Sequence, residues 1–354
     1  MSLSVGIVGL PNAGKSTLFN ALLGRQVAKA ENYPFCTIEP NIGVVEVPDE
    51  RLPVLAKIEK SQAIIPAVVK FVDIAGLVKG AAQGEGLGNK FLAHIREVDL
   101  ICYLLRFFTD DNIDRAGSIN PEDDLSVLRT ELSLKDLETL EKSLTKKPKN
   151  DEEILRFQIV NKISSLLERG ILPNSYKFGK EEKEVLDNLF LLTAKEEMIV
   201  LNVGEKDLVA GSEIFDKFTN LDPVVVCAKT EEELSLLNLE ERKEYLAGLG
   251  VRQSGLEKLI KQAYQKLGLI SFYTAGEKEA RAWTVKDGTL APQAAGVIHS
   301  DFEKSFIKAE VANFDDFVKF GGWAKCRTLG KTRFEGQDYQ ISNDEVVEFR
   351  VGKN

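Results

Sequence analysis

Cysteine and histidine are scarce in this chain. Its 354 residues include two histidines and four cysteines, Cys36, Cys102, Cys227 and Cys326. The cysteines are widely spaced and form no Cys-x-x-Cys or Cys/His pattern, so the sequence predicts neither a disulfide framework nor a structural metal site. We expect reduced thiols, as in the cytosol.

Long apolar runs are missing too. No segment approaches the roughly 18 apolar residues that a membrane-spanning helix needs. The first apolar segment begins almost at the N-terminus, which leaves no room for a signal peptide. The composition, with 44% hydrophobic and 29% charged residues, is typical of a soluble globular protein. We therefore expect a cytoplasmic protein without a membrane partner.

The chain also lacks an excess of positive charge. Its formal net charge is −9, which disfavours broad, non-specific adhesion to nucleic acid but allows a local basic patch. We expect no DNA partner. The length suggests two or three domains.

The most informative segment is residues 9–17, which read GLPNAGKST. It has the form Gly-x-x-x-x-Gly-Lys-Ser, follows the apolar run 5–8 and precedes the helical pattern 16–23. The glycines allow successive N–H groups to point at phosphate oxygens, and the helix N-terminus adds its positive dipole end. Lys15 is therefore predicted to reach the β- and γ-phosphates, and the Ser16 hydroxyl to bind Mg²⁺.

Strand-like and helix-like segments alternate around this loop. Short apolar runs of strand length occur at 42–47, 68–72, 100–105, 198–201 and 224–226. Helical patterns follow at about 231–246 and 254–267. The alternation predicts an α/β domain with a mainly parallel sheet, whose ligands bind at the carboxyl ends of the strands.

A helical pattern interrupts this alternation. Residues 120–124 are a strong helix start, with Asn120 as the N-cap and Pro121 at the first position. Leucines three or four apart follow; the segment 145–150 then breaks the helix, and a second amphipathic arm begins near Asp151. The two arms predict an inserted helical hairpin. They cover too few heptads to predict a coiled coil, and two ordinary surface helices are the alternative.

The sequence pattern changes once more near residue 270. Short β-like runs, glycine-rich turns and several aromatic residues predict a small β-rich domain. We therefore expect a P-loop nucleotide-binding domain at 1–124 and 196–269, the helical insertion at 125–195 and the C-terminal domain at 270–354.

Further candidates for the metal and the γ-phosphate lie in two segments. Asp73-Ile74-Ala75-Gly76 follows an apolar strand and fits the Asp-x-x-Gly pattern of switch GTPases. Asp73 is predicted to hold Mg²⁺ through water, and the Gly76 N–H to bond the γ-phosphate. Thr37 lies between the first helix and the second strand, where a switch threonine binds the metal; an ordinary loop threonine is the alternative.

The base-recognition motif departs from that of ordinary GTPases. Those proteins use Asn-Lys-x-Asp, whose Asp accepts two hydrogen bonds from guanine. Here the strand is followed by Asn202-Val203-Gly204-Glu205. The longer carboxylate does not suit the two-bond geometry, and adenine offers an acceptor at N1, so the pocket is predicted to favour ATP. After the next strand, Cys227-Ala228-Lys229 resembles the loop that closes over the base.

Hydrolysis is predicted to be slow. Leu77 follows Gly76, where Ras-type GTPases carry a glutamine that orients the attacking water. A leucine side chain cannot hydrogen-bond water. Lys15 and Gly76 are then the predicted catalytic residues, and the group that positions the water is unassigned.

These motifs together closely resemble the Obg-like ATPase (YchF) family, over essentially the whole chain. The segments that carry the resemblance are 9–17, 31–41, 71–81, 84–92, 202–205, 272–285 and 291–307. The resemblance implies an ATP-preferring hydrolase with an α-helical coiled-coil hairpin at 125–195 and a β-grasp-like TGS domain at 270–354. Its members associate with ribosomes, so ribosomal RNA is an expected partner.

The resemblance also implies roles for individual residues. Those expected to hold the phosphates are Asn12, Ala13, Gly14, Lys15, Ser16 and Thr17. Ser16 and Thr37 are expected to bind Mg²⁺, and Asn202 and Val203 to lie at the adenine. Asn12 resembles the asparagine of potassium-stimulated relatives, so K⁺ is a second candidate cofactor.

One position departs from the family pattern. Many members carry a histidine, as the proposed water-positioning group, where this chain has Tyr103. Neutral tyrosine can hydrogen-bond water, but with a pKa of about 10 it is a poor general base. Tyr103 is therefore only a candidate for that role, and His94 is an alternative nearby in the sequence.

A basic cluster is a candidate for contact with RNA. Its residues are Lys325, Arg327, Lys331 and Arg333, next to Trp323 and Phe334. Such residues serve phosphate contact and base stacking, and a solvated basic loop is the alternative. Two other functions stay open: an Obg-type GTPase, and an ATP-regulated binding protein with negligible hydrolysis.

Overall fold

The computed structural model describes residues 3–24, 41–74, 95–108, 120–144, 148–208, 218–251 and 253–352. Their contacts divide the chain into two compact units. The first contains the described residues of 3–24, 41–43 and 70–259, and the second those of 44–69 and 260–352. Within the described ranges, we find no helix whose length and apolar character would allow it to cross a membrane.

A six-stranded sheet carries the strands that the apolar runs predict. In chain order they are β1 (Ser4–Val8), β2 (Ile42–Glu46), β4 (Val68–Asp73), β5 (Leu100–Phe107), β6 (Glu196–Val203) and β7 (Val224–Val226). The spatial order is β2-β4-β1-β5-β6-β7. Strand β1 is parallel to β4 and β5, β5 to β6, and β6 to β7. The predicted α/β fold with a mainly parallel sheet is confirmed.

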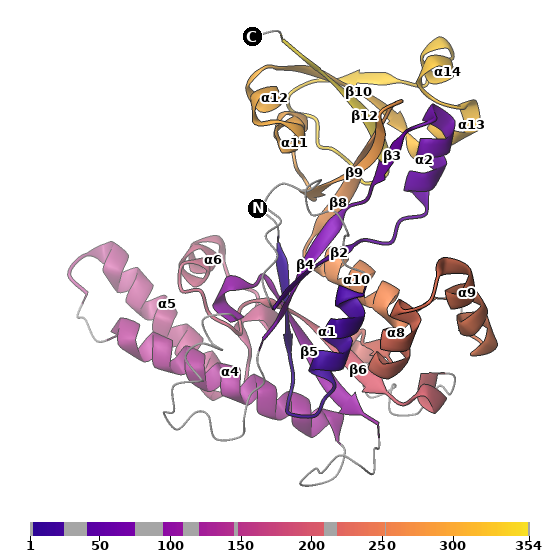
Figure 1. The fold of residues 1–354 in the computed structure, drawn as a ribbon. Helices are drawn as coiled ribbons and strands as arrows, with labels where there is room; N and C mark the ends of the chain where they lie inside the picture. The colour runs from indigo at the N-terminus through magenta and orange to yellow at the C-terminus, as the bar shows by residue number, and fades with distance from the viewer. Residues whose placement is uncertain are drawn as a thin grey trace. The chain divides into compact units, whose positions relative to one another are not determined.

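Helices follow the strands of this sheet. They are α1 (Lys15–Leu23), α8 (Ala228–Ser235), α9 (Leu239–Gly248) and α10 (Gly255–Lys266). Helices α1 and α8 pack side by side (Figure 1). The helical pattern at 231–246 is two helices, because Asn238 caps α9 by accepting from the N–H groups of Glu240 and Glu241, each at 3.0 Å.

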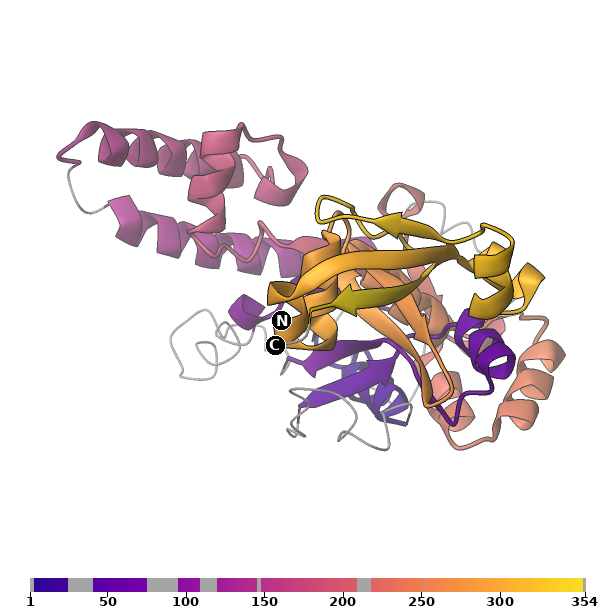
Figure 2. The same ribbon diagram turned by 90° about the horizontal axis from the view of Figure 1, so that it is seen from above.

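The predicted helical insertion contains α4 (Pro121–Leu144), α5 (Asp151–Glu168) and α6 (Lys180–Asp187). Helix α4 begins where the sequence predicts, and Asn120 Oδ1 accepts from the Glu122 N–H at 3.2 Å. Asn150 caps α5 through the Glu153 N–H at 2.8 Å. Helices α4 and α5 lie side by side (Figure 2) and share an apolar cluster with α6 that includes Leu140.

Helix α4 also covers part of the first sheet. Its Leu125, Leu128 and Leu132 belong to one buried cluster with alternate residues of β5 and β6. The members from those two strands are Ile101, Tyr103, Leu105, Ile199, Leu201 and Val203. Side chains alternate between the faces of a strand, so the intervening residues of β5 and β6 point away from α4.

The second unit is built on another six-stranded sheet. Its strands are β3 (Ala63–Ile65), β8 (Leu269–Ala275), β9 (Glu279–Lys286), β10 (Phe306–Asn313), β11 (Arg333–Glu335) and β12 (Glu345–Val351), in the order β11-β10-β12-β8-β9-β3. Its helices are α2 (Arg51–Glu59), α11 (Ala291–Ile298), α12 (Ser300–Lys304), α13 (Phe314–Phe320) and α14 (Trp323–Thr328). The strands predicted after about residue 270 are present, together with helices that the sequence pattern does not predict.

Residues 44–69 lie in the second unit, whereas the sequence places them in the nucleotide-binding domain. Strand β3 pairs in parallel with β9 and forms the edge of the second sheet. Ser61 Oγ donates to the Gly276 carbonyl at 2.7 Å, and the Trp323 N–H donates to Glu59 Oε1 at 3.1 Å. The segment between β2 and β4 is therefore a structural part of the C-terminal unit.

Candidate nucleotide-binding site

The predicted phosphate loop connects β1 to α1, as the sequence requires. Gly14 stands at the N-cap of α1 with φ at 90°, a conformation that favours glycine. Gly9 is required for a different reason: a Cβ there would lie 2.6 Å from the Leu104 carbonyl oxygen. The two glycines thus allow a tight loop whose last turn ends at the free N–H groups of a helix N-terminus, an arrangement suited to anions.

Lys15 folds back onto its own loop. Its Nζ donates to the carbonyl oxygens of Gly9 at 2.8 Å and Leu10 at 3.0 Å. Burial lowers the pKa of Lys15, and the negative charge of Asp73 acts in the opposite direction. The ammonium group is therefore held by weak backbone acceptors, for which phosphate oxygens are stronger substitutes.

Asp73 ends β4 and lies near Lys15. Burial raises its pKa, and the charge of Lys15 acts in the opposite direction. Its Oδ1 is buried and has no hydrogen-bond partner among the described residues. An unsatisfied carboxylate oxygen fits a hard cation such as Mg²⁺, either directly or through a water molecule.

The remaining metal candidates are only partly visible. Ser16 follows Lys15 on α1 and lines a cavity, while Thr37 and Gly76 lie outside the described residues. In the described part of the chain, no group of three or more His, Cys, Asp and Glu side chains could hold a metal ion. Mg²⁺ needs no such group beside a triphosphate, because phosphates and water supply most of its ligands.

Asn202 connects three loops. It is the last residue but one of β6, is 3% exposed, and donates from Nδ2 to the Ala13 carbonyl at 2.9 Å. Its Oδ1 accepts from the Ala228 N–H at 3.0 Å. Asn202 therefore joins the phosphate loop to the start of α8. The sequence predicts a place at the base for this residue, but not the bonds that engage both ends of its amide.

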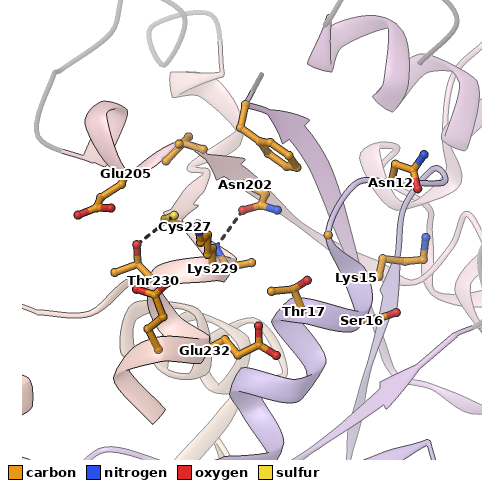
Figure 3. A pocket seen from close by; sticks show the side chains of 16 residues that line it. Asn12, Lys15, Ser16, Thr17, Asn202, Glu205, Cys227, Lys229, Thr230 and Glu232 are labelled. Atoms are coloured by element: carbon orange, nitrogen blue, oxygen red, sulfur yellow. Dashed lines mark hydrogen bonds between the residues drawn. The ribbon is translucent and has the colours of Figure 1, made fainter. Parts of the chain in front are cut away.

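A cavity of about 640 Å³ lies between these loops (Figure 3). Its lining residues are Asn12, Gly14, Lys15, Ser16, Thr17, Phe108, Asn202, Val203, Gly204, Glu205, Cys227, Ala228, Lys229, Thr230, Glu232 and Glu233. In Figure 3, Lys15, Ser16 and Thr17 approach from one side, and Cys227, Lys229 and Thr230 from the other. Three segments that are far apart in the sequence thus line the same cavity.

The residues that line the cavity are not identical to the predicted site residues. Ala13 is buried, is absent from the lining and supplies its carbonyl to Asn202; its phosphate contact stays a prediction. The sequence-based reasoning misses Phe108, Thr230, Glu232 and Glu233. Phe108 directly follows β5, and the carboxyl end of a parallel strand is a signal that could have found it.

Tyr103 is in the wrong place for a water-positioning group. It is 2% exposed, belongs to the apolar cluster beneath α4, and is absent from the cavity lining. Burial raises the pKa of its hydroxyl, with a further contribution from the charge of Glu197. The described geometry thus contradicts the sequence-based candidate, because β5 turns this position away from the site. The alternative, His94, lies outside the described residues.

The basic cluster of the second unit is largely paired with acids. Arg327 bonds Glu310 at 2.8 Å, Arg333 bonds Glu335 at 3.0 Å, and Lys331 lies 3.6 Å from Asp316. Trp323 is 8% exposed, whereas Phe334 is 58% exposed. The cluster is therefore less positive than its sequence suggests, and only Phe334 of its two aromatic residues is exposed.

A phosphate loop between the first strand and first helix of a parallel sheet defines a class of proteins. Residues 9–15 occupy that position, and the loops after β6 and β7 complete the cavity beside them. This arrangement assigns the chain to the P-loop nucleotide-binding proteins.

Comparison with known proteins identifies the group within that class. A sequence profile described as "50S ribosome-binding GTPase" matches residues 4–161, and the profile YchF-GTPase_C, described as "Protein of unknown function (DUF933)", matches residues 269–352. "Ribosome-binding ATPase YchF" of Bacillus subtilis (strain 168) is 45% identical over 364 residues, covering 99% of each chain. The protein of that name from Haemophilus influenzae is also 45% identical, again with 99% of each chain covered.

A solved structure agrees with these relatives. The YchF GTPase of Schizosaccharomyces pombe superposes with a TM-score of 0.87 at 35% identity, covering 99% of this chain and 98% of that one. This chain belongs to the YchF family.

Proposed function

We propose that this chain binds ATP in the cavity beside residues 9–17, hydrolyses it slowly, and acts as a nucleotide-controlled switch on the ribosome. The observation that carries the proposal is the single cavity shared by the phosphate loop, the 202–205 motif and the 227–229 loop. A phosphate cradle next to a pocket of this size suits a nucleoside triphosphate. The bacterial relatives named above as ribosome-binding ATPases support the ribosomal part.

Adenine is the base that we propose. Glu205 lines the cavity in place of the aspartate that holds guanine in ordinary GTPases, and the motif has no lysine. Val203, Cys227, Ala228 and Lys229 are proposed as further base and ribose contacts. The S. pombe relative is titled a GTPase. The alternative function is therefore that of an Obg-type GTPase, which binds guanine.

The phosphates and metal are assigned to the opposite end of the cavity. We assign the phosphates to Asn12 and the loop N–H groups, with Lys15 exchanging its two carbonyl partners for phosphate oxygens. Ser16 and Thr37 would hold Mg²⁺ directly and Asp73 through water. When bound, the ion neutralises charge on the β- and γ-phosphates. K⁺ near Asn12 is a further proposal.

Slow turnover is expected because the described residues include no identified water-positioning group. Leu77 cannot orient water, and Tyr103 is buried away from the cavity. This observation favours one second candidate, an ATP-regulated binding protein with negligible hydrolysis. In both cases, we propose that the helical insertion formed by α4, α5 and α6 is a coiled-coil hairpin. We also propose that the C-terminal sheet belongs to a TGS domain that contacts ribosomal RNA.

Two measurements separate these functions. Calorimetric titration with ATP and with GTP should show tighter binding of ATP; a preference for GTP would reverse the base assignment. Single-turnover hydrolysis should be slow for the protein alone and faster with ribosomes and K⁺. If hydrolysis stays at the background rate under every condition, the remaining function is that of an ATP-regulated binding protein.

A further inference from the structure

Arg106 carries a positive charge in the interior of the first unit. It lies near the carboxyl end of β5, opposite Asn202 of β6, and is 3% exposed. Among the described residues, its Nη1 atom is buried without a hydrogen-bond partner. A buried donor that makes no bond costs stability, and the cost is larger when the group is charged. An arginine at this position therefore calls for a role that compensates for this cost.

In the described part of the chain, Arg106 makes two polar contacts with the same residue, Phe108. Its Nε donates to the Phe108 carbonyl at 3.1 Å, and its guanidinium carbon lies 4.7 Å from the centre of the Phe108 ring. One side chain thus holds both the backbone and the ring of Phe108. Because the guanidinium is buried, this cation–π contact is desolvated and stronger than it would be at the surface.

Phe108 in turn lines the nucleotide cavity, together with Asn202 and Val203. It follows directly after β5, and its position therefore depends on how the chain leaves that strand. Arg106 is not among the lining residues. Any effect of Arg106 on a bound nucleotide would pass through Phe108.

We propose that Arg106 is a positioning residue of the nucleotide site, which fixes Phe108 as an aromatic wall against the base. This inference rests on the proposed nucleotide-binding function. Arg106 does not line the cavity, so we expect it to act on the affinity for the nucleotide and not on the hydrolytic step. The cost of burying the unpaired Nη1 offsets the stability that the contacts with Phe108 provide. The protein without nucleotide therefore gains little stability from Arg106.

The substitutions Arg106→Met and Phe108→Ala test this role, separately and combined, by calorimetric titration with ATP. Arg106→Met is expected to weaken ATP binding about tenfold, which is roughly 1.4 kcal/mol. The single-turnover rate at saturating ATP should be unchanged, and the melting temperature without nucleotide should stay the same or rise. The double variant should bind no worse than the weaker single variant, because both changes remove the same wall.

Two further variants serve as controls. Arg106→Lys keeps the charge but lacks the planar group that stacks and donates from Nε, so it should lose nearly as much affinity as Arg106→Met. Arg129→Met removes an arginine of the same unit that pairs with Glu197 on β6 and does not line the cavity. It is expected to lower the melting temperature without changing ATP affinity.

The outcomes decide between the roles. Wild-type affinity in Arg106→Met or in Arg106→Lys, or losses that multiply in the double variant, would overturn the positioning role. A lower melting temperature with unchanged affinity would show that Arg106 is merely structural. If the wild-type protein itself binds neither ATP nor GTP, the proposed function is wrong and this inference falls with it.

Discussion

Asn202 Nδ2 and the carbonyl oxygen of Ala13 are 2.9 Å apart, and this bond joins the end of strand β6 to the phosphate loop. The same side chain accepts from the Ala228 N–H, so one buried amide holds the two sides of the cavity together. The shape of the cavity near the start of α8 and that of the phosphate loop are therefore linked through this side chain.

Replacing this residue tests the link. Asn202→Ala leaves the buried Ala13 carbonyl and Ala228 N–H without this partner, which should cost about 1–3 kcal/mol of stability. ATP affinity, measured by calorimetric titration, should fall at least about tenfold. Asn174→Ala is a matched control, because Asn174 Nδ2 also donates to a backbone carbonyl, that of Lys195 at 3.0 Å, outside the cavity. Equal ATP affinity in both variants would contradict the linking role.

Asp73 is expected to matter only when Mg²⁺ is present. Asp73→Asn removes the carboxylate charge, so Mg²⁺ should strengthen ATP binding much less in the variant than in the wild type. With the metal chelated, the two proteins should bind ATP alike. The free protein should not lose stability, because burial already disfavours the charged form of Asp73. Asp187→Asn, at an exposed position on α6, is the control; an undiminished Mg²⁺ effect in Asp73→Asn would remove Asp73 from the metal site.

Tyr103 should be dispensable for hydrolysis. Tyr103→Phe removes only a hydroxyl from the apolar cluster under α4, and the single-turnover rate with ATP is expected to stay within about twofold of wild type. Lys15→Ala provides the comparison, since loss of the phosphate-binding ammonium should abolish turnover. A tenfold slower rate in Tyr103→Phe would return this residue to the mechanism.

Asp49 should make the stability of the second unit sensitive to acid. Burial raises its pKa, but hydrogen bonds from Arg51 and Tyr273 outweigh that effect and leave the pKa below its ordinary value. The Tyr273 hydroxyl donates to Asp49 Oδ2 at 2.5 Å. A depressed carboxyl pKa stabilises the fold above the unfolded value of about 3.9, and this contribution is lost as the pH falls through the folded pKa.

Thermal melting between pH 3 and pH 7 measures this contribution. Asp49→Asn should lower stability at pH 7 by about 1–3 kcal/mol, and the difference from wild type should shrink towards pH 3. Asp338→Asn, at an exposed position in the same unit, should follow the wild-type curve. A gap between Asp49→Asn and wild type that is as large at pH 3 as at pH 7 would refute the assigned ionisation.

The local features of this chain can be predicted from its sequence. The phosphate loop depends on glycines whose backbone geometry few other residues adopt, and the starts of α4 and α5 depend on Asn120 and Asn150, whose side chains cap the adjacent turn. These signals involve residues within a few positions of one another. They indicate the class of fold, predict where phosphates would bind, and mark the starts of α4 and α5.

Only the tertiary structure decided which distant residues meet. Nothing local in residues 44–69 shows that β3 completes the C-terminal sheet, because strand pairing is settled by a partner more than two hundred residues away, as in Ala63 opposite Glu279. The burial of Tyr103 likewise depended on which face of β5 the helix α4 covers. The sequence by itself determined the phosphate-loop motif around Lys15 and predicts phosphate binding there. The packing of β5, β6 and α8 decided which side chains line the rest of the cavity, because side chains alternate between the two faces of a strand and the tertiary structure sets what each face meets.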